Sequence, residues 1–433
     1  MYHARGFLGI ALMILISWVV SSDRRRFPLK TVVGGLVLQF ALALLVLKTP
    51  WGQAFFEWVG SLVTVLLRGA DAGAKFVFGP LAGDDPHVTW SAVAGIKIMT
   101  TIIAVAALTS LGYHYGIMQQ VVRAMSWVMT RVLGVTGAES LSGAANVFLG
   151  QTEAPLFVRP LLPTVTQSEL MAIMAGGFAN ISVGVMAYYI SLLGVDSHGI
   201  ASGARMNEVA RDLLTASLMS IPASFITAKI MIPPGDEARP THMEKVIAPI
   251  ETKNGIDAAT TGASEGMMLA INVLAMLIAF IALITVVDAG LIAIGKWSMI
   301  SPLVAKCGLK QLDLDGILGF TFSPIAWANG VEWKDCHVFG GLLGKSMATN
   351  EMIAYGSLSE MLRSGVMSQR SVTMATYSLC GFANFSSIGI QIGGIGSLAP
   401  TRRADLVRLG PRAMLAGAMA TWMTGCIAGM LIP

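Results

Sequence analysis

Two short stretches of this 433-residue chain are nearly identical, and together they decide its fold. Gly-Phe-Ala-Asn-Ile-Ser occupies residues 177–182, and Gly-Phe-Ala-Asn-Phe-Ser-Ser occupies residues 381–387. Each follows a polar segment that contains a glutamate: Asn-Val-Phe-Leu-Gly-Gln-Thr-Glu-Ala-Pro at 146–155, and Lys-Ser-Met-Ala-Thr-Asn-Glu-Met-Ile-Ala-Tyr at 345–355. Polar, glycine-interrupted segments at corresponding positions of two halves are typical of the binding sites of secondary transporters.

The repeat is imperfect in its spacing. Glu153 precedes Asn180 by 27 residues, whereas Glu351 precedes Asn384 by 33. We therefore expect the same unit twice, a polar tip with a carboxylate followed by an interrupted helix, but with different local lengths.

The composition assigns the chain to a membrane. It is 54% hydrophobic and 12% charged, with a mean hydropathy of +0.68, whereas a soluble domain carries about 25% charged residues. The net charge of +4 forms no basic stripe, so no nucleic-acid partner is indicated. The four cysteines are dispersed and form no Cys-x-x-Cys pair, which argues against a metal site or a disulfide framework. An all-α polytopic membrane protein is predicted.

A membrane-spanning helix needs about 20 apolar residues. The stretch 51–68 carries charges and is better explained as an interfacial helix. The first apolar run is followed by Arg24 to Arg26 rather than by a cleavage site, so we expect it to be retained as a helix. Eight spans are expected near residues 6–22, 31–48, 91–113, 169–194, 210–232, 266–295, 371–397 and 407–432.

Two further segments, residues 137–163 and 316–357, mix apolar residues with amides, carboxylates and prolines. Each is long enough for two short helices that meet at a polar tip. Irregular backbone at membrane depth is tolerated only where it is buried in protein or lines a cavity. Both segments are therefore predicted to be re-entrant hairpins.

The basic residues set the orientation. They cluster in residues 24–30 and 402–412, between the first and second spans and between the seventh and eighth. By the positive-inside rule these loops are cytoplasmic, which leaves both termini outside and makes the two hairpins enter from opposite sides. The chain then divides into residues 1–90 (scaffold helices), 91–232 (first repeat), 233–265 (cytoplasmic linker) and 266–433 (second repeat).

Glu153 and Glu351 are the first candidates for a functional site. A carboxylate at the centre of a membrane costs roughly 2.5–3.5 kcal/mol even on a lenient scale. Each must therefore meet a donor, a proton or a cation. A structural carboxylate that caps a broken helix is the alternative, but the matching repeat positions favour function.

Asn180 and Asn384 are the next candidates. A lone buried Asn is more often a contact between helices. Two in the same glycine-containing frame instead suggest local unwinding, which exposes carbonyl oxygens that suit Na⁺. Phe178 and Phe382 are either core residues or stacking surfaces.

No enzyme is indicated. Residues 262–266 match Gly-x-Ser-x-Gly, but that motif requires a strand before it and a helix after it. His-Glu-x-x-His is absent, and the six histidines are scattered. A channel is the other alternative, but the polar residues cluster in two central segments rather than along a pore.

Three motifs resemble the signatures of the concentrative nucleoside transporters, of the shorter bacterial type. They are Gly-Gln-Thr-Glu-Ala-Pro at 150–155, Asn-Glu-x-x-Ala-Tyr at 350–355 and Gly-Phe-Ala-Asn-Phe-Ser-Ser-Ile-Gly at 381–389. The resemblance covers most of the chain. It implies a homotrimer in the bacterial inner membrane, in which each protomer has eight spans, two opposed hairpins, two broken helices and its own nucleoside.

The resemblance also implies residue roles. The base would lie against the first hairpin tip and the fourth span, and the ribose against the second tip and the seventh span. Substrate contacts would be Gln151, Thr152, Glu153 and Val185 on the base side, and Glu351, Phe382, Asn384 and Ser387 on the sugar side. Na⁺ would be bound by the side chains of Asn146 and Asn180 and the carbonyls of Leu149 and Ile181.

The coupling ion stays open at this point. Sodium-coupled relatives commonly carry a small hydroxyl residue where this chain has Asn180. An amide oxygen also suits Na⁺, so Na⁺ symport is favoured. The alternative is H⁺-coupled symport with Glu153 or Glu351 as the proton carrier.

Overall fold

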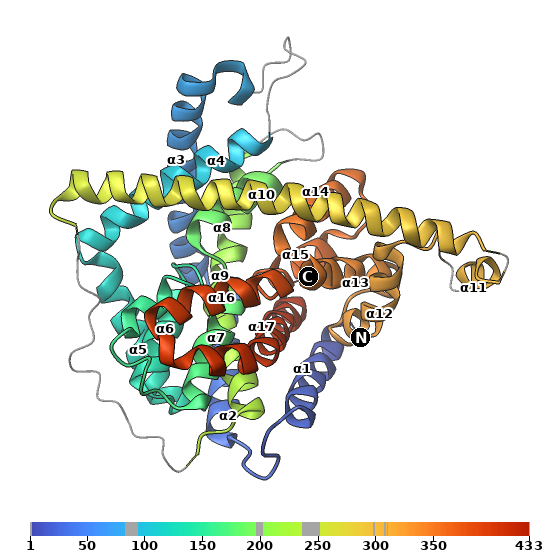
Figure 1. Ribbon diagram of the computed structural model, residues 1–433, viewed down its shortest axis with the longest axis horizontal. Helices are drawn as coiled ribbons and strands as arrows, with labels where there is room; N and C mark the ends of the chain where they lie inside the picture. The colour runs from blue at the N-terminus through green and yellow to red at the C-terminus, as the bar shows by residue number, and fades with distance from the viewer. Residues whose placement is uncertain are drawn as a thin grey trace.

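A computed structural model describes residues 2–82, 94–195, 202–235, 252–297, 299–306, 309 and 311–432. These residues form α-helices and a few 3₁₀ helices (η) (Figure 1). In chain order the elements are α1 (Tyr2–Val19), α2 (Leu29–Lys48), α3 (Pro50–Phe78), η1 (Gly79–Ala82), α4 (Ala94–His114), α5 (Ile117–Leu133), α6 (Gly137–Asn146), η2 (Ala154–Val158), α7 (Gln167–Phe178), α8 (Val183–Leu193), α9 (Gly203–Met231), α10 (Gly255–Gly295), α11 (Ser301–Lys306), α12 (Leu314–Ala328), α13 (Trp333–Ala348), α14 (Glu351–Ser364), α15 (Gln369–Ser378), α16 (Phe385–Leu398), η3 (Pro400–Arg402) and α17 (Arg403–Leu431).

The all-α membrane fold is confirmed. Within the described residues, six helical segments are long and apolar enough to cross a membrane, and two shorter apolar helices accompany them. Seven of the eight predicted spans coincide largely with these segments. The seventh, 371–397, coincides with them only over its second half, because its first half is the polar helix α15 and the break that follows. The long segments are residues 29–48, 95–114, 167–193, 203–231, 255–295 and 400–431, and the shorter helices are residues 4–19 and 385–398. The predicted interfacial segment 51–68 lies within the longer α3 and is not one of the six.

Both repeated stretches interrupt a helix, as the sequence predicts. α7 ends at Phe178 and α8 begins at Val183, so the first copy forms a break between them. α15 ends at Ser378 and α16 begins at Phe385, within the second copy, so the first half of that copy lies in the break. The two breaks are in contact, since the Phe382 amide donates to the Asn180 carbonyl oxygen at 3.3 Å.

The order of elements occurs twice. A long helix, a shorter helix, a hairpin, a broken helix and a second long helix follow one another from α4 to α9. The same order recurs from α10 to α17, with the additional short helix α11 between α10 and α12. The second arm of the first hairpin is the short η2, whereas that of the second hairpin is the full helix α14. This difference explains part of the wider spacing between the glutamate and the asparagine in the second copy. The rest arises at the breaks, because Asn180 closely follows the end of α7, whereas Asn384 lies at the far end of its break, directly before α16.

Several predicted boundaries need correction. The segment 316–357 contains three helices rather than two: α12 packs against α13, and the polar tip lies between α13 and α14. α10 begins at Gly255, before the predicted end of the linker, and α9 begins at Gly203 rather than near 210. Hydrophobic length decides these boundaries poorly, because both helices start with polar turns. Residues 236–251 of the linker and 83–93 before α4 lie outside the described residues.

Each hairpin is tied at its base to the broken helix that follows it. The Thr136 hydroxyl, just before α6, donates to Glu169 of α7 at 2.6 Å. In the second repeat, the Ser368 hydroxyl before α15 donates to Asp335 of α13 at 2.7 Å. These corresponding contacts fix the start of each hairpin, so the position of its tip follows from the length of its first arm.

Small residues on α17 allow the two broken helices to pack closely against it. A Cβ atom added at Gly417 would collide with Phe178 at the end of α7, and one added at Gly425 would collide with Ser378 at the end of α15. Gly417, Thr421, Gly425 and Gly429 recur every four residues along α17 and form a packing face, as small residues do in other membrane helices. It positions both breaks.

We expect Gly425→Val to destabilise the protein by about 1–3 kcal/mol, because an overpacked core must shift neighbouring groups. Gly393→Val on α16 is the control, since no atom lies within 4 Å of the site of its added Cβ. Thermal unfolding in detergent should show a lowered midpoint for the first variant only. Equal midpoints would contradict the packing role.

The helix α10 runs across the width of the molecule in the view of Figure 1, past α4, α8 and α14. It packs closely along α4. This pair forms a wall that faces the first hairpin, and it is the outer boundary of the cavity described below.

Candidate functional site

The tip of the second hairpin carries a buried carboxylate held by two donors. Glu351 is the first residue of α14, and Asn350 caps that helix by accepting from the Ile353 amide at 3.0 Å. Glu351 Oε1 accepts from the Tyr189 hydroxyl at 3.1 Å, and Oε2 accepts from Asn384 Nδ2 at 3.0 Å. Side chains from the hairpin and from both broken helices therefore meet here.

The orientation of Asn384 is fixed by its role as a helix cap. It precedes α16, and its Oδ1 accepts from the Ser387 amide at 2.9 Å and from the Ser386 hydroxyl at 2.7 Å. Because the Asn384 oxygen accepts these two hydrogen bonds, the NH₂ group of the same amide points the other way, toward Glu351. Phe382, in the break just before, is half-buried.

Tyr189 is a site residue that the sequence analysis missed. Its ring stacks on Tyr355 of α14, with centroids 4.0 Å apart, and the Tyr355 hydroxyl donates to the Thr376 carbonyl at 2.7 Å. Val185 lies four residues before Tyr189 on α8 and so on the same face of the helix. That spacing was the available signal.

The tip of the first hairpin contacts α16. Gln391 Nε2 donates to Gln151 Oε1 at 3.1 Å, and a Cβ added at Gly394 would collide with Thr152. Asn384, Ser387 and Gln391 recur at helical spacing along α16. One polar face of α16 therefore joins the tip of the second hairpin to the tip of the first. Gln391 was also missed by the sequence analysis.

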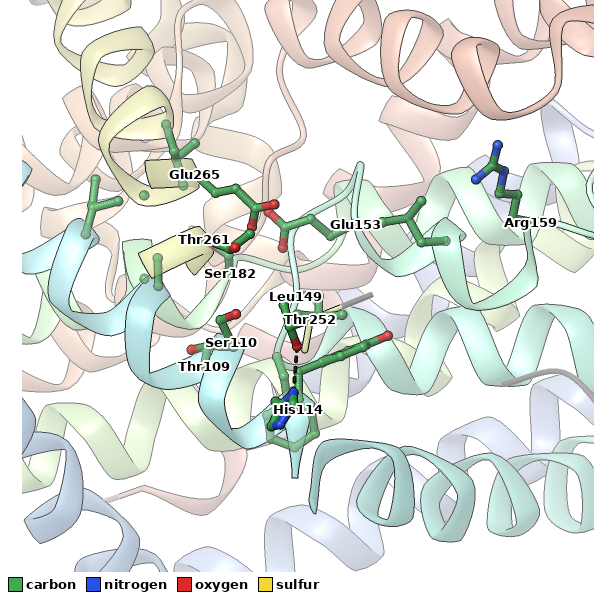
Figure 2. Close-up of a pocket in the computed structure, with 18 residues that line it drawn as sticks. Thr109, Ser110, His114, Leu149, Glu153, Arg159, Ser182, Thr252, Thr261 and Glu265 are labelled. Carbon is green, nitrogen blue, oxygen red and sulfur yellow. Dashed lines mark hydrogen bonds between the residues drawn. The ribbon is translucent and has the colours of Figure 1, made fainter. Parts of the chain in front are cut away.

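Glu153 lies apart from this face and lines a cavity of about 470 Å³. Its Oε2 accepts from the Gly150 amide at 3.0 Å. The cavity lies between the first hairpin tip and the α4–α10 wall, and Leu149, Ser182 and Glu265 also line it. Figure 2 shows Glu153 and Glu265 projecting toward one another. A cavity of this volume is of the size that proteins use for small-molecule ligands.

The structure also shows that one sequence motif beside the cavity is not a catalytic motif. The Gly-x-Ser-x-Gly match at residues 262–266 lies within the continuous helix α10, without the strand and turn that a nucleophile of this kind needs. Glu265 of this stretch instead faces the cavity. Among the described residues, no group of three or more His, Cys, Asp or Glu side chains is arranged to bind a metal ion.

The two asparagines among the predicted cation ligands, Asn146 and Asn180, both lie next to Gly176. A Cβ added at Gly176 would lie 3.4 Å from Asn146 Nδ2, and Asn180 Nδ2 donates to the Gly176 carbonyl at 3.3 Å. Both asparagine side chains are buried, yet Asn146 has no partner for Oδ1 or Nδ2, and Asn180 has none for Oδ1, among the described residues. A buried polar atom without a partner costs about 1–3 kcal/mol, which favours a ligand at these oxygens.

The other two predicted cation ligands are backbone carbonyl oxygens. The Val183 amide donates to the Phe148 carbonyl at 3.1 Å, which joins the first break to the first hairpin tip. The neighbouring carbonyls of Leu149 and Ile181 accept no hydrogen bond from the described residues. Amide and carbonyl oxygens of an unwound segment are suitable ligands for Na⁺.

Comparison with known proteins shows the family to which the chain belongs. Residues 212–429 match the family described as "Na+ dependent nucleoside transporter C-terminus", residues 8–81 match its N-terminus, and residues 95–196 match "Nucleoside recognition". The chain belongs to the concentrative nucleoside transporter family. It is 37% identical to an uncharacterized transporter of Bacillus subtilis, YutK, over 99% of both chains. It is 38% identical to rat solute carrier family 28 member 3, over 98% of this chain and 58% of the rat protein.

Solved structures show the same fold. A structure of CNTnw in an inward-facing substrate-bound state is 33% identical and superposes with a TM-score of 0.87, covering 100% of this chain and 98% of that one. A CNTnw variant in an outward-facing state gives 0.88 with 32% identity, covering 100% and 98%. Membership of this family makes the chain a membrane transporter rather than an enzyme, as the sequence predicts.

Proposed function

We propose that this protein is a symporter that carries nucleosides into the cell together with Na⁺, and that its substrate lies between the two hairpin tips and the two helix breaks. The observation that carries the proposal is the buried Glu351 carboxylate, bonded to Tyr189 of one broken helix and Asn384 of the other. An ionisable residue inside a membrane protein is costly to bury and is a functional candidate by default.

The chemistry of Glu351 suits ribose hydroxyls. An ionised carboxylate has about four acceptor positions, and the described residues occupy two of them. Two positions then remain for the hydroxyl groups of a sugar. Asn384 and Ser387 lie on the same side of the site, and Phe382 offers an apolar surface beside them. These are the proposed ribose contacts.

The base is assigned to the first hairpin tip. Gln151, Thr152 and Glu153 supply donors and acceptors there, and Val185 on α8 supplies an apolar wall. Glu153 projects into the neighbouring cavity, on the side of the tip away from α16. The proposal places the sugar at one end of the polar face of α16 and the base at the other.

Na⁺ is treated as a co-transported substrate. Asn146 Oδ1, Asn180 Oδ1 and the carbonyls of Leu149 and Ile181 are four oxygens without partners among the described residues, and this donor set fits Na⁺. Because these atoms lie on the first tip and the first break, a bound ion would hold the base-binding turn against α8. Na⁺ and nucleoside would therefore strengthen each other's binding.

The cellular setting follows from the similarity to bacterial transporters and from the charge pattern. We place the protein in the bacterial cytoplasmic membrane, with both termini outside and the basic loops inside. A homotrimer with one substrate site in each protomer is the proposed assembly, and the four-part division of the chain remains part of this proposal.

Competition between uridine and free uracil tests the proposed ribose contacts. A site built to hydrogen-bond hydroxyl groups rejects analogues that lack them by large factors. Uridine should therefore displace labelled uridine at concentrations at least about 100-fold lower than free uracil does. Binding to purified protein in detergent measures this directly. Equal potency of uracil and uridine would refute the ribose contacts.

A further inference from the structure

Gln391 of α16 makes two hydrogen bonds that belong to different parts of the site. It is fully buried, and its Nε2 donates to the Met174 carbonyl of α7 at 3.1 Å and to Gln151 Oε1 at 3.1 Å. Gln391 therefore joins the second broken helix to the first and to the first hairpin tip.

These contacts fix the orientation of two amide groups in turn. The Met174 carbonyl can only accept, so the group that faces it must be the NH₂ of Gln391. The second hydrogen of that NH₂ points to Gln151, which must then offer its oxygen. With Oε1 of Gln151 engaged, its two N–H donors remain for another partner. The Met174 carbonyl therefore determines the orientation of both the Gln391 and the Gln151 amide groups, whichever atom of each amide is taken as nitrogen or oxygen.

We infer that Gln391 is a positioning residue that holds Gln151 with its N–H donors toward the substrate, and so selects nucleobases that present a carbonyl oxygen there. The inference rests on the proposed nucleoside site and specifies its substrate class. Uridine and cytidine form a matched pair for this purpose. At one ring position uridine carries a carbonyl group beside a ring N–H, whereas cytidine carries an amino group beside an unprotonated ring nitrogen. An amino group placed against the Gln151 donors would leave N–H groups facing one another.

The unpaired donors give the expected size of the effect. A buried polar group without a partner costs about 1–3 kcal/mol. The unchanged protein should therefore bind uridine roughly tenfold more tightly than cytidine. Inosine and adenosine differ in the same way. Inosine, which carries the carbonyl group, should therefore bind more tightly than adenosine.

Substitution of Gln391 should change the ratio of uridine affinity to cytidine affinity, and the direction of the change should depend on the new side chain. Gln391→Met cannot hold the Gln151 amide, so the uridine-to-cytidine ratio should fall close to one. Gln391→Glu offers an acceptor to Gln151 whether or not its carboxyl group is protonated. The Gln151 amide should then turn over and present its oxygen, so that cytidine binds more tightly than uridine.

Gln39 provides a closely matched control. It is also fully buried, its Nε2 donates to the Met219 carbonyl at 3.1 Å, and its Oε1 has no partner among the described residues, but it lies on α2 away from the site. Gln39→Met should lower stability as much as Gln391→Met does and leave the ratio unchanged. Isothermal titration with uridine and cytidine measures both ratios. An equal loss of affinity for the two nucleosides in the Gln391 variants would overturn the inference.

A second measurement separates this inference from the proposed function. Thermal unfolding of Gln151→Ala, Gln391→Ala and the double variant, all without ligand, gives the coupling between the two side chains. The double variant should be less destabilised than the sum of the single variants. Additive effects would disprove the Gln391–Gln151 contact even if nucleosides bind. Clear coupling without any nucleoside binding would instead reject the nucleoside site, and with it the inferred selection among bases.

Discussion

Glu351→Gln is expected to lower nucleoside affinity by about 10- to 150-fold while the protein stays folded. Hydrogen bonds to a charged group contribute about 1.5–3 kcal/mol, and the neutral amide loses this contribution to the ribose hydroxyls. The fold should tolerate the change. The amide oxygen can still accept from Asn384, and the new NH₂ can donate to the Tyr189 hydroxyl, which is free to rotate. Isothermal titration with uridine measures the loss.

Glu360→Gln is the control for this prediction. Glu360 lies on the same helix, α14, but its side chain is exposed and away from the breaks. The Glu360 variant should bind uridine as the unchanged protein does. Near-normal binding by a well-folded Glu351→Gln protein would show that this carboxylate serves the fold rather than the substrate.

Asn146→Ala is expected to remove most of the stimulation of uridine binding by Na⁺. The substitution deletes one of the four oxygens proposed for the ion, and it also removes two buried polar atoms without partners, so the fold should not be weakened by a lost hydrogen bond. Uridine affinity at saturating Na⁺ should fall toward the Na⁺-free value of the unchanged protein. Titrating uridine at a series of Na⁺ concentrations measures this.

Asn329→Ala is the matched control. Asn329 is equally buried and equally without partners among the described residues, but it lies between α12 and α13. Its replacement should preserve the Na⁺ dependence. If both variants respond to Na⁺ as the unchanged protein does, the ion does not bind at Asn146.

The repeated motif was sufficient to predict the breaks in both helices, and it singled out Glu351 and Asn384, which the structure brings into contact. Helix interruption follows from local sequence, and a carboxylate in an apolar segment must be compensated wherever it lies. Tyr189 and Gln391 were not predicted, because their roles arise only when the two halves of the chain pack together. A tyrosine in an apolar helix gives no local sign that its hydroxyl reaches a glutamate 162 residues away.

The boundaries of the second hairpin illustrate a different limit. The predicted segment 316–357 includes α12, whereas the hairpin consists of α13 and α14, with Asn350 and Glu351 at its tip as expected. Tertiary packing decides which helices pair. The cavity beside Glu153 was also beyond prediction, because α10 supplies its far wall, including Glu265.

The energetics allow substantial accumulation with one ion per substrate. A monovalent cation moving down 100 mV releases about 2.3 kcal/mol, and a tenfold gradient adds about 1.4 kcal/mol. Together these support a nucleoside gradient of roughly several hundredfold. A neutral nucleoside gains nothing from the potential itself, so accumulation requires the ion.

The most direct test is uridine uptake into proteoliposomes under an imposed inward Na⁺ gradient at equal pH on both sides. The proposed site predicts transient accumulation above the external concentration, and loss of that accumulation in Asn146→Ala but not in Asn329→Ala. Absence of uptake under the Na⁺ gradient, with robust uptake under an inward proton gradient, would contradict sodium coupling and assign the coupling to a proton.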